Sequence, residues 1–272
     1  MKKSHIIDGV ALTKFLFWLK KNFKRKKITE ISAQKKLENF RKTNKNYKFP
    51  SFSTISGSGP NSAIIHYKAS TESNRTLKED DLYLVDSGGQ YSFGTTDVTR
   101  TVSLNNNSKF IKNVYTSVLK GHIAVADYKI KKNSTGSDVD RSARKPLRKI
   151  GLDYPHGTGH GVGYFLNVHE GPQSFSQKNK IKLKPGMIIS NEPGYYKEGL
   201  FGIRIENLIY IKKNEFKELT MAPMEKKLIN KKMLSKKEID WLNKYHLKVK
   251  KNLFKFMNRE EKASLIDSCS PI

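Results

Sequence analysis

The sequence has a single cysteine, Cys269, close to its C-terminal end. One cysteine excludes an intrachain disulfide, so the fold must be stabilised without covalent cross-links of that kind. A reducing compartment suits such a chain, and we predict a cytoplasmic protein.

Long apolar runs are also missing. The stretch from Val10 to Leu19 is too short to span a bilayer and is interrupted by Lys14. Lysines follow it directly and no small-residue cleavage site is present, so we expect neither a signal peptide nor contact with a membrane. The spacing instead predicts an amphipathic helix whose apolar face is formed by Leu12, Phe15, Leu16 and Leu19.

Acidic residues are scarce, with 25 Asp and Glu against 52 Lys and Arg, which gives a net charge of +27. Such a surplus invites a phosphate-binding interpretation. The lysines are spread along the whole chain, however, and no nucleic-acid-binding motif is present. We therefore expect no specific nucleic-acid partner, only weak polyanion binding at low salt.

No low-complexity linker or repeat of short period divides the 272 residues, so we predict one domain with a sizeable core. The core is expected over about residues 5–230, followed by a helical extension over 231–272. Thr29 is a candidate N-cap for the second helix. The helices that periodicity predicts lie at 5–22, 29–44, 108–129, 137–150 and 235–257.

Strands are predicted by apolar runs between these helices. Two β-rich runs within 82–104 are separated by glycines and predict an antiparallel pair. Further strands are expected at 186–191 and 203–212, with a turn-rich segment at 50–60 and a glycine-rich loop at 156–163. The order of helices and strands indicates an α+β domain with segregated layers.

Two aspartates flank the glycine-containing bend of the predicted antiparallel pair. Asp86 ends the first β-rich run and Asp97 begins the second, so strand pairing would bring both carboxylates to the same place. Aspartates at hairpin ends are usually solvated turn residues. Alone, the pair is weak evidence of a metal site.

A second charged pair lies in the apolar run GIRIENLIYI. The period of two puts Arg204 and Glu206 on one face of a strand, with Ile203 and Ile205 on the other. A charged pair on a buried face needs a partner. Viewed in isolation, it is equally consistent with a structural salt bridge.

Glu192 follows the apolar run 187–190 and precedes a proline turn. His160 lies in the loop HGTGHGVG, where alternating glycines let the backbone approach a site closely. A lone histidine is more often structural than a ligand. Four histidines in a chain with only seven are harder to dismiss as structural: His66, His156, His160 and His169.

Taken together, four carboxylates and one imidazole form a candidate ligand set: Asp86, Asp97, His160, Glu192 and Glu206. Four carboxylate charges would balance two divalent cations, and a bridging hydroxide would serve as a further negative ligand. The set therefore predicts a hydrolytic dinuclear site.

The segments that carry these residues resemble, in order and spacing, the catalytic domain of aminopeptidase P, particularly its cytosolic eukaryote-like branch. They are AIIHY, LVDSGGQY, GTTDVTRT, HGTGHGVG, NVHEGP, NEPGYY and GIRIEN. The similarity runs from about His5 to near Met257 and includes DGVALTKFLFWL, TEISA and WLNKYHL. It implies a pita-bread fold, with two pseudo-symmetric αβ halves around a metal site. The implied activity removes the N-terminal residue from peptides whose second residue is proline.

Residue by residue, the resemblance implies that Asp86 holds one metal, that His160 and Glu192 hold the other, and that Asp97 and Glu206 bridge both. Manganese is the implied metal, and cobalt or zinc would also suit such a site. The bridging hydroxide would attack the carbonyl before proline, with Glu192 as proton shuttle.

Five further residues match family positions near the substrate. His66 and His169 would contact the substrate and stabilise the developing oxyanion. His156 would line the proline side, and Tyr196 and Arg204 would orient ligands or substrate. The predicted catalytic residues are therefore His66, His169 and Glu192.

The family usually carries one or two domains ahead of this catalytic domain, whereas this sequence begins at about its start. A naturally short protein, a piece of a split gene and a truncated chain would each account for that. The expected partners are Xaa-Pro peptides, a second copy in a homodimer and, for a split gene, a separately encoded N-terminal domain.

Three alternatives stay open. A prolidase shares the metal set but cuts only dipeptides ending in proline. A catalytically weak pita-bread binding module is disfavoured, because four converging carboxylates without cations would repel in a buried site. The creatinase type, which uses the fold without metal, is disfavoured by the complete ligand set.

Overall fold

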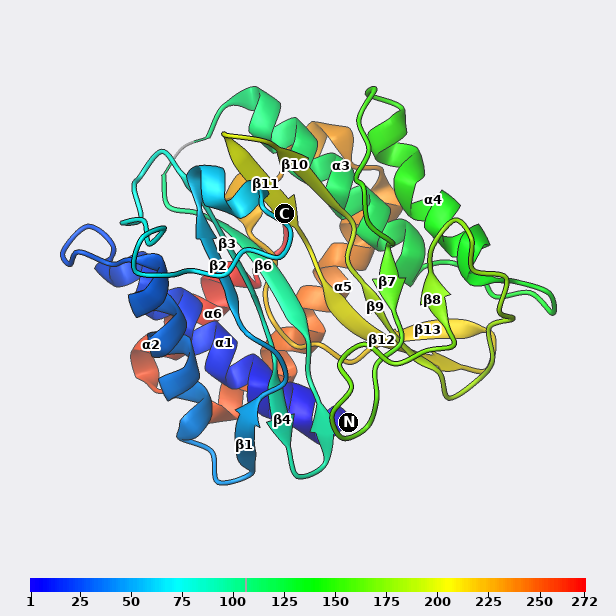
Figure 1. The fold of residues 1–272 in the computed structure, drawn as a ribbon, viewed down its shortest axis with the longest axis horizontal. Helices are drawn as coiled ribbons and strands as arrows, with labels where there is room; N and C mark the ends of the chain where they lie inside the picture. The colour runs from blue at the N-terminus through cyan, green and yellow to red at the C-terminus, as the bar shows by residue number, and fades with distance from the viewer. Residues whose placement is uncertain (106) are drawn as a thin grey trace.

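A computed structural model of the chain describes residues 1–105 and 107–272, and Figure 1 shows their arrangement. In the first half, two helices pack on an antiparallel sheet with the strand order β2-β3-β6. These elements are α1 (Lys2–Asn22), α2 (Glu30–Lys42), β2 (Ile55–Ser58), β3 (Leu82–Ser87) and β6 (Val98–Ser103).

The core of this half confirms the apolar face predicted for the first helix. Leu12, Phe15, Leu16 and Leu19 are all buried and share one cluster with residues of β3 and β6. The predicted N-cap is also confirmed, because the Thr29 hydroxyl accepts from the Ser32 backbone N–H at 3.2 Å. Local sequence and long-range packing therefore specify the same helices here.

The second half repeats the plan of the first. Two helices again pack against a three-stranded antiparallel sheet, ordered β13-β12-β9. Its elements are α3 (Lys109–Ala126), α4 (Gly136–Arg148), β9 (Ile188–Asn191), β12 (Asn207–Lys212) and β13 (Glu215–Glu218). The predicted α+β class is confirmed.

Smaller sheets of two or three short strands complete the framework. They are β1 (Tyr47–Pro50) with β4 (Gly89–Tyr91) and β5 (Gly94–Thr95), β7 (Gly159–His160) with β8 (Ser174–Phe175), and β10 (Gly194–Lys197) with β11 (Phe201–Arg204). A 3₁₀ turn, η1 (Gly59–Ala63), follows β2.

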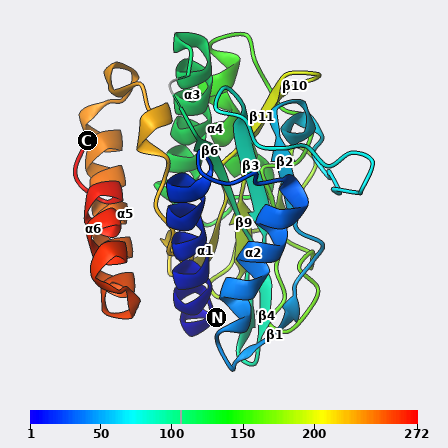
Figure 2. The same ribbon diagram turned by 90° about the vertical axis from the view of Figure 1, so that its left-hand side faces the viewer.

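At the C-terminal end, α5 (Lys236–Leu253) and α6 (Arg259–Ser268) lie outside α1 and α3, as Figure 2 shows. Leu242, Tyr245 and Val249 of α5 are buried in the core, as their spacing predicts. The predicted helix over 235–257 was too long, because a 3₁₀ turn over Phe254–Phe256 ends it. Within the described residues, no helix combines the length and hydropathy needed to cross a bilayer.

The prediction of one strand over 203–212 was wrong. The backbone N–H of Ile205 donates to Pro193 O at 3.3 Å, and that of Glu206 donates to Thr99 O at 3.2 Å. The chain thus leaves its partner β10 after Arg204 and pairs with β9 from Asn207 onward. This change of partner divides the run into β11 and β12.

Two other segments are more regular than predicted. The segment 50–60, predicted as turns, contains β2, because its residues pair with β3 in spite of a serine- and glycine-rich sequence. The glycine-rich loop contains β7, in which Gly159 and His160 pair with β8. Both strands depend on partners that are distant in sequence, which local propensity does not report.

Candidate metal centre

The first half contributes two carboxylates from neighbouring strand ends. Asp86 in β3 lies opposite Thr99 in β6, and Ser87 lies opposite Val98. Asp97, directly before β6, therefore lies beside the end of β3. The prediction that strand pairing brings these two aspartates together is confirmed.

The second half contributes an imidazole and two more carboxylates. His160 lies in β7, Glu192 directly follows β9, and Glu206 lies between β11 and β12. The backbone N–H of Glu192 donates to Thr158 O at 2.8 Å, and that of His160 donates to Ser190 Oγ at 2.9 Å. These bonds fix the two side chains relative to one another.

The close approach of β7 to β9 requires glycine at position 159. A Cβ atom there would lie 1.8 Å from the carbonyl oxygen of Ser190, which no side chain can tolerate. The alternating glycines of HGTGHGVG thus include at least one that the close contact of two strands demands.

All five predicted metal ligands line one cavity. The His160 Nε2 atom lies 3.4 Å from Asp97 Oδ2 and 3.3 Å from Glu192 Oε1. Ligand atoms of Asp97, His160 and Glu206 all lie within 4.8 Å of one another. The cavity is lined by Phe52, Ile55, Ile65, His66, Asp86, Asp97, His160, His169, Glu192, Arg204 and Glu206.

Burial and mutual repulsion perturb the acids of this cavity. Burial raises the pKa of Glu206 well above its usual range, and the nearby carboxylates of Asp97 and Asp86 raise it further. The pKa of Asp86 is also raised, mainly by burial, although Arg204 opposes the shift. A cation among these oxygens would offset both effects.

His160 is oriented to act as a ligand. Its Nδ1 lies 3.0 Å from Gly161 O, and because a carbonyl oxygen only accepts, Nδ1 carries the proton. Nε2 therefore faces the carboxylates. Burial lowers the pKa of His160, but Asp97 and Glu192 outweigh it and raise the value to about 9.

The side chains present fit a pair of divalent cations. Asp86 Oδ1 is buried and has no hydrogen-bond partner among the described residues. Glu206 Oε2 accepts from the Thr99 hydroxyl at 2.7 Å, which fixes the orientation of the carboxylate. Oxygen-rich sites with one imidazole suit manganese and related metals.

Arg204 lies against one side of the cavity and pairs with Asp86 instead of the adjacent Glu206. Its NH2 group donates to Asp86 Oδ2 at 2.7 Å, and its NH1 group donates to the Tyr196 hydroxyl at 2.6 Å. Arg204 thus does form a buried salt bridge, the structural alternative considered from the sequence, and its partner is Asp86.

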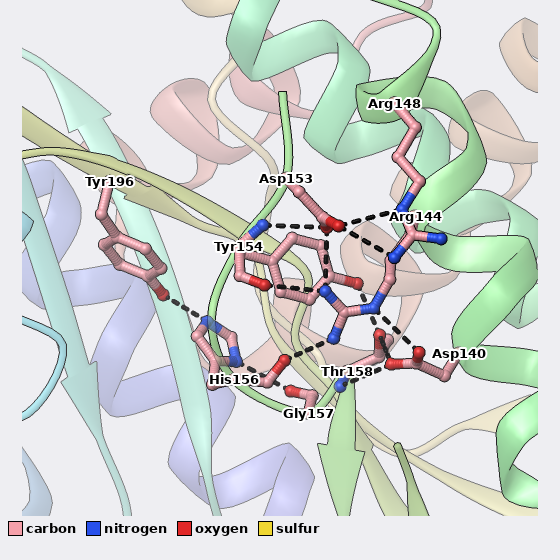
Figure 3. Close-up of polar contacts among 9 residues, drawn as sticks. All are labelled: Asp140, Arg144, Arg148, Asp153, Tyr154, His156, Gly157, Thr158 and Tyr196. Atoms are coloured by element: carbon pink, nitrogen blue, oxygen red, sulfur yellow. Dashed lines mark hydrogen bonds and ion pairs between the residues drawn. The ribbon is translucent and has the colours of Figure 1, made fainter. Parts of the chain in front are cut away.

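His156 and Tyr196 lie behind Arg204 and are not among the described residues that line the cavity. The His156 Nδ1 atom donates to Gly157 O at 2.7 Å, so the neutral ring accepts from the Tyr196 hydroxyl at Nε2, at 2.8 Å (Figure 3). Burial lowers the pKa of His156, which favours this neutral form. Tyr196 accepts from Arg204, and His156 bonds to Tyr196; the predicted roles of both residues at the substrate stay predictions.

The other two predicted histidines do line the cavity. The His169 ring lies 4.2 Å from the His160 ring in an edge-to-face arrangement. Burial and the adjacent His160 lower the pKa of His169. His66 lines the cavity on the segment that follows η1.

Sequence reasoning missed several residues that shape the site. The hydroxyl of Thr99 holds Glu206, and that of Ser190 donates to Glu192 Oε1 at 2.9 Å. Thr99 could have been found from the strand period of two, which places it on the same face as Asp97. The apolar lining residues Phe52 and Ile55 gave no comparable signal.

Fold and ligand set together define a metallopeptidase. Residues 1–213 match the metallopeptidase family M24, and residues 213–272 match the C-terminal region of peptidase_M24. The chain therefore belongs to family M24, and its architecture of two αβ halves is the pita-bread fold predicted above.

Within that family the chain is similar to aminopeptidases. It is 46% identical over 264 residues to aminopeptidase P2 of Arabidopsis thaliana, covering 92% of this chain and 37% of that protein. A structure of X-prolyl aminopeptidase from Caenorhabditis elegans, described as a cytosolic enzyme with a di-nuclear active site, superposes with a TM-score of 0.96. That match has 39% identity and covers 100% of this chain and 47% of the other.

Xaa-Pro dipeptidase of Bacillus anthracis is also similar, with a TM-score of 0.73 and 29% identity over 83% of this chain and 60% of the other. The chain spans about half the length, or less, of the curated relatives it matches.

Proposed function

We propose that the chain forms the catalytic part of a metal-dependent aminopeptidase that releases the N-terminal residue from peptides with proline in the second position. The observation that carries the proposal is the convergence of four carboxylates and His160 Nε2 in one buried cavity. The similarity to X-prolyl aminopeptidase over the whole chain supports the substrate class.

The proposed ligand assignment divides the five residues between two ions. Asp86 would hold one ion, and His160 with Glu192 the other. Asp97 and Glu206 would bridge both, in agreement with their burial and with the proximity of both to His160. Two divalent ions, most simply manganese, with cobalt or zinc as alternatives, would supply Lewis acidity and a water of lowered pKa.

The chain's own residues would bind and orient the peptide and move one proton. Glu192 is the candidate proton carrier because its Oε1 accepts from Ser190 Oγ and faces the cavity beside His160. His66 and His169 line the same cavity and would stabilise negative charge on the peptide oxygen. Arg204 donates to both Tyr196 and Asp86 and would keep the Asp86 carboxylate in place.

A peptide bond that precedes proline has no N–H, because the fixed ring of proline closes on its nitrogen. The site must therefore bind it without an amide donor. The cavity offers the apolar side chains Phe52, Ile55 and Ile65 beside its polar groups. These surfaces are suited to a ring. Prolidase activity is the alternative, because the Bacillus anthracis dipeptidase shares this fold at lower similarity.

The first experiment compares metal-stripped protein with and without added Mn²⁺ on Xaa-Pro-Xaa and Xaa-Pro peptides. Manganese-dependent release of the first residue from the tripeptide, lost in Glu192→Gln, is the expected result. Cleavage of the dipeptide alone would indicate prolidase. Metal binding without turnover of either peptide would indicate a missing N-terminal domain or a binding module, and would contradict the proposed activity of this chain.

We also propose, as properties of the whole protein, a cytoplasmic location, homodimerisation and, for a split gene, pairing with a separately encoded N-terminal domain. The description of the Caenorhabditis elegans relative as cytosolic supports the first. Gel filtration of the native protein tests the second. We further propose that residues 1–272 form one catalytic domain, with 231–272 as its helical extension.

A further inference from the structure

Arg144, a buried arginine outside the cavity, holds residues 154–158, the segment that contains His156 and leads to His160. Arg144 projects from α4 and is only 4% exposed. Its NH1 group donates to Tyr154 O at 2.7 Å, and its NH2 group donates to His156 O at 2.5 Å. Its guanidinium carbon also lies 4.1 Å from the centre of the Tyr154 ring (Figure 3).

The charge of Arg144 is balanced on both sides. Its Nε donates to Asp140 Oδ2 at 2.8 Å, and its NH1 group donates to Asp153 Oδ1 at 2.8 Å. Asp140 is fully buried, and its other oxygen accepts from the Thr158 hydroxyl at 2.7 Å. One arginine and one aspartate of α4 thus fix residues 154, 156 and 158 of the same segment.

This segment leads straight into the candidate metal centre. The Thr158 carbonyl oxygen accepts the backbone N–H of Glu192, and His160 follows two residues later. From Thr158 onward the segment bonds directly to β9, since the Val162 N–H donates to Ile188 O and Gly161 forms a bridge with Ile189. Residues 154–158, which precede β7, are held by the Arg144 and Asp140 side chains of α4.

We propose that Arg144 and Asp140 form a positioning pair that sets the distance between His160 and Glu192, and thereby the affinity of one of two divalent cations. The inference rests on the proposed function only for the identity of the ligands. Among the described residues, no hydrogen bond or ion pair joins Arg144 to a residue that lines the cavity, so it acts through the backbone carbonyls of Tyr154 and His156 and through Asp140 with Thr158. Asp86 lies on the other half of the molecule, and its ion should be affected less.

Arg148 provides a matched control. It lies one turn along α4 and also pairs with Asp153, its Nε donating to Oδ2 at 2.9 Å, but it is largely exposed. Arg144→Lys keeps the charge beside Asp140 but removes the planar group that reaches two carbonyls at once. Arg148→Lys removes the same kind of group from a position without backbone contacts.

The test is calorimetric titration of metal-free protein with Mn²⁺, with melting temperature as the check on folding. We expect Arg144→Lys to weaken one of two sites, by no more than the roughly 10- to 100-fold that loss of a direct hydrogen-bond partner of a ligand causes. Arg148→Lys should leave both sites unchanged. A lower melting temperature in Arg144→Lys with unchanged affinity at both sites would show a purely structural role and overturn the proposal.

Thr158 gives a second route if Arg144→Lys does not fold. Thr158→Val removes the hydroxyl that donates to Asp140 and also bonds to the Tyr154 hydroxyl, and Thr158→Ser restores it. Weaker binding at one site in the valine variant, rescued in the serine variant, supports the proposal; equal binding in both overturns it. If wild-type protein binds Mn²⁺ but cleaves no Xaa-Pro peptide, the proposed function fails while this titration still decides the role of Arg144.

Discussion

Arg204 and Asp86 form a buried ion pair across 118 residues of sequence, with 2.7 Å between the NH2 nitrogen and Oδ2. The pair joins β11 to β3 and lies at the edge of the metal cavity. Asp86 Oδ1 has no hydrogen-bond partner among the described residues, so Arg204 supplies much of the compensation for the buried aspartate.

Replacing Arg204 by methionine should therefore destabilise the metal-free protein by about 3–5 kcal/mol, the usual cost of leaving one member of a buried pair uncompensated. Saturating Mn²⁺ should reduce that loss, because a cation compensates Asp86 in its place. Urea unfolding of both proteins with and without Mn²⁺ measures the effect. An equal loss in both conditions would show that no cation reaches Asp86.

Mn²⁺ should stabilise the wild-type protein and not Asp97→Asn. A ligand that binds only the folded state adds about 2.7 kcal/mol when its concentration is 100 times Kd. In the metal-free protein Asp97→Asn removes both a charge that repels Glu206 and a partner of His160, so these two effects on stability oppose one another. The exposed Asp240→Asn is the control and should keep the full Mn²⁺ effect; thermal unfolding with and without metal compares all three.

Three histidines that are buried as neutral rings should each reduce stability as the solution becomes acidic, whereas the raised pKa values of Glu206 and Asp86 act in the opposite direction. Burial lowers the pKa of His5 to about 4 and those of His122 and His246 to about 3. Between pH 6.5 and these values the unfolded chain binds protons that the folded chain does not, so unfolding becomes more favourable as pH falls.

His246→Gln isolates one of these contributions. The His246 Nε2 atom accepts from the Met224 backbone N–H at 3.1 Å, a bond that a glutamine oxygen can replace. Lowering the pH from 7 to 5 should then cost the variant about 2 kcal/mol less than the wild type, following 1.36 kcal/mol per pKa unit. Identical losses in the two proteins would mean that His246 is protonated in the folded state.

Phe15→Ala tests the packing of α1. The side chain is fully buried between α1 and the first sheet, so its removal should cost about 3–5 kcal/mol. Leu247→Ala, on the exposed face of α5, should change stability by no more than about 0.5 kcal/mol. Urea unfolding gives both values, and a small effect of Phe15→Ala would place this helix outside the cooperative core.

Local patterns were sufficient for the pair of aspartates and for α1 to α5, apart from the end of α5, whereas α6 was not predicted. The spacing of Leu12, Phe15 and Leu19 predicts the buried face of α1, and glycine-separated β-rich runs predict that Asp86 and Asp97 meet. In each case the deciding contacts lie within one helix or between neighbouring strands.

Contacts between distant segments could not be predicted in the same way. The break between β11 and β12 results from Ile205 and Glu206 bonding to Pro193 and Thr99. The resemblance supplied Arg204 as a site residue, but nothing in GIRIEN indicates that it pairs with Asp86 and not with Glu206. Arg144 lies in no motif, and its burial and its bonds to Asp140 and to two backbone carbonyls, which distinguish it from Arg148, depend on the folded structure.

The division of the candidate ligands between the two αβ halves has a mechanical consequence. Asp86 and Asp97 come from the first half, while His160, Glu192 and Glu206 come from the second. Neither half holds a complete set, so a bound cation acts as a reversible cross-link between them. Removal of the metal should therefore weaken the contact between the halves before either helix-covered sheet unfolds. Amide hydrogen exchange should then become faster first along β6 and β11.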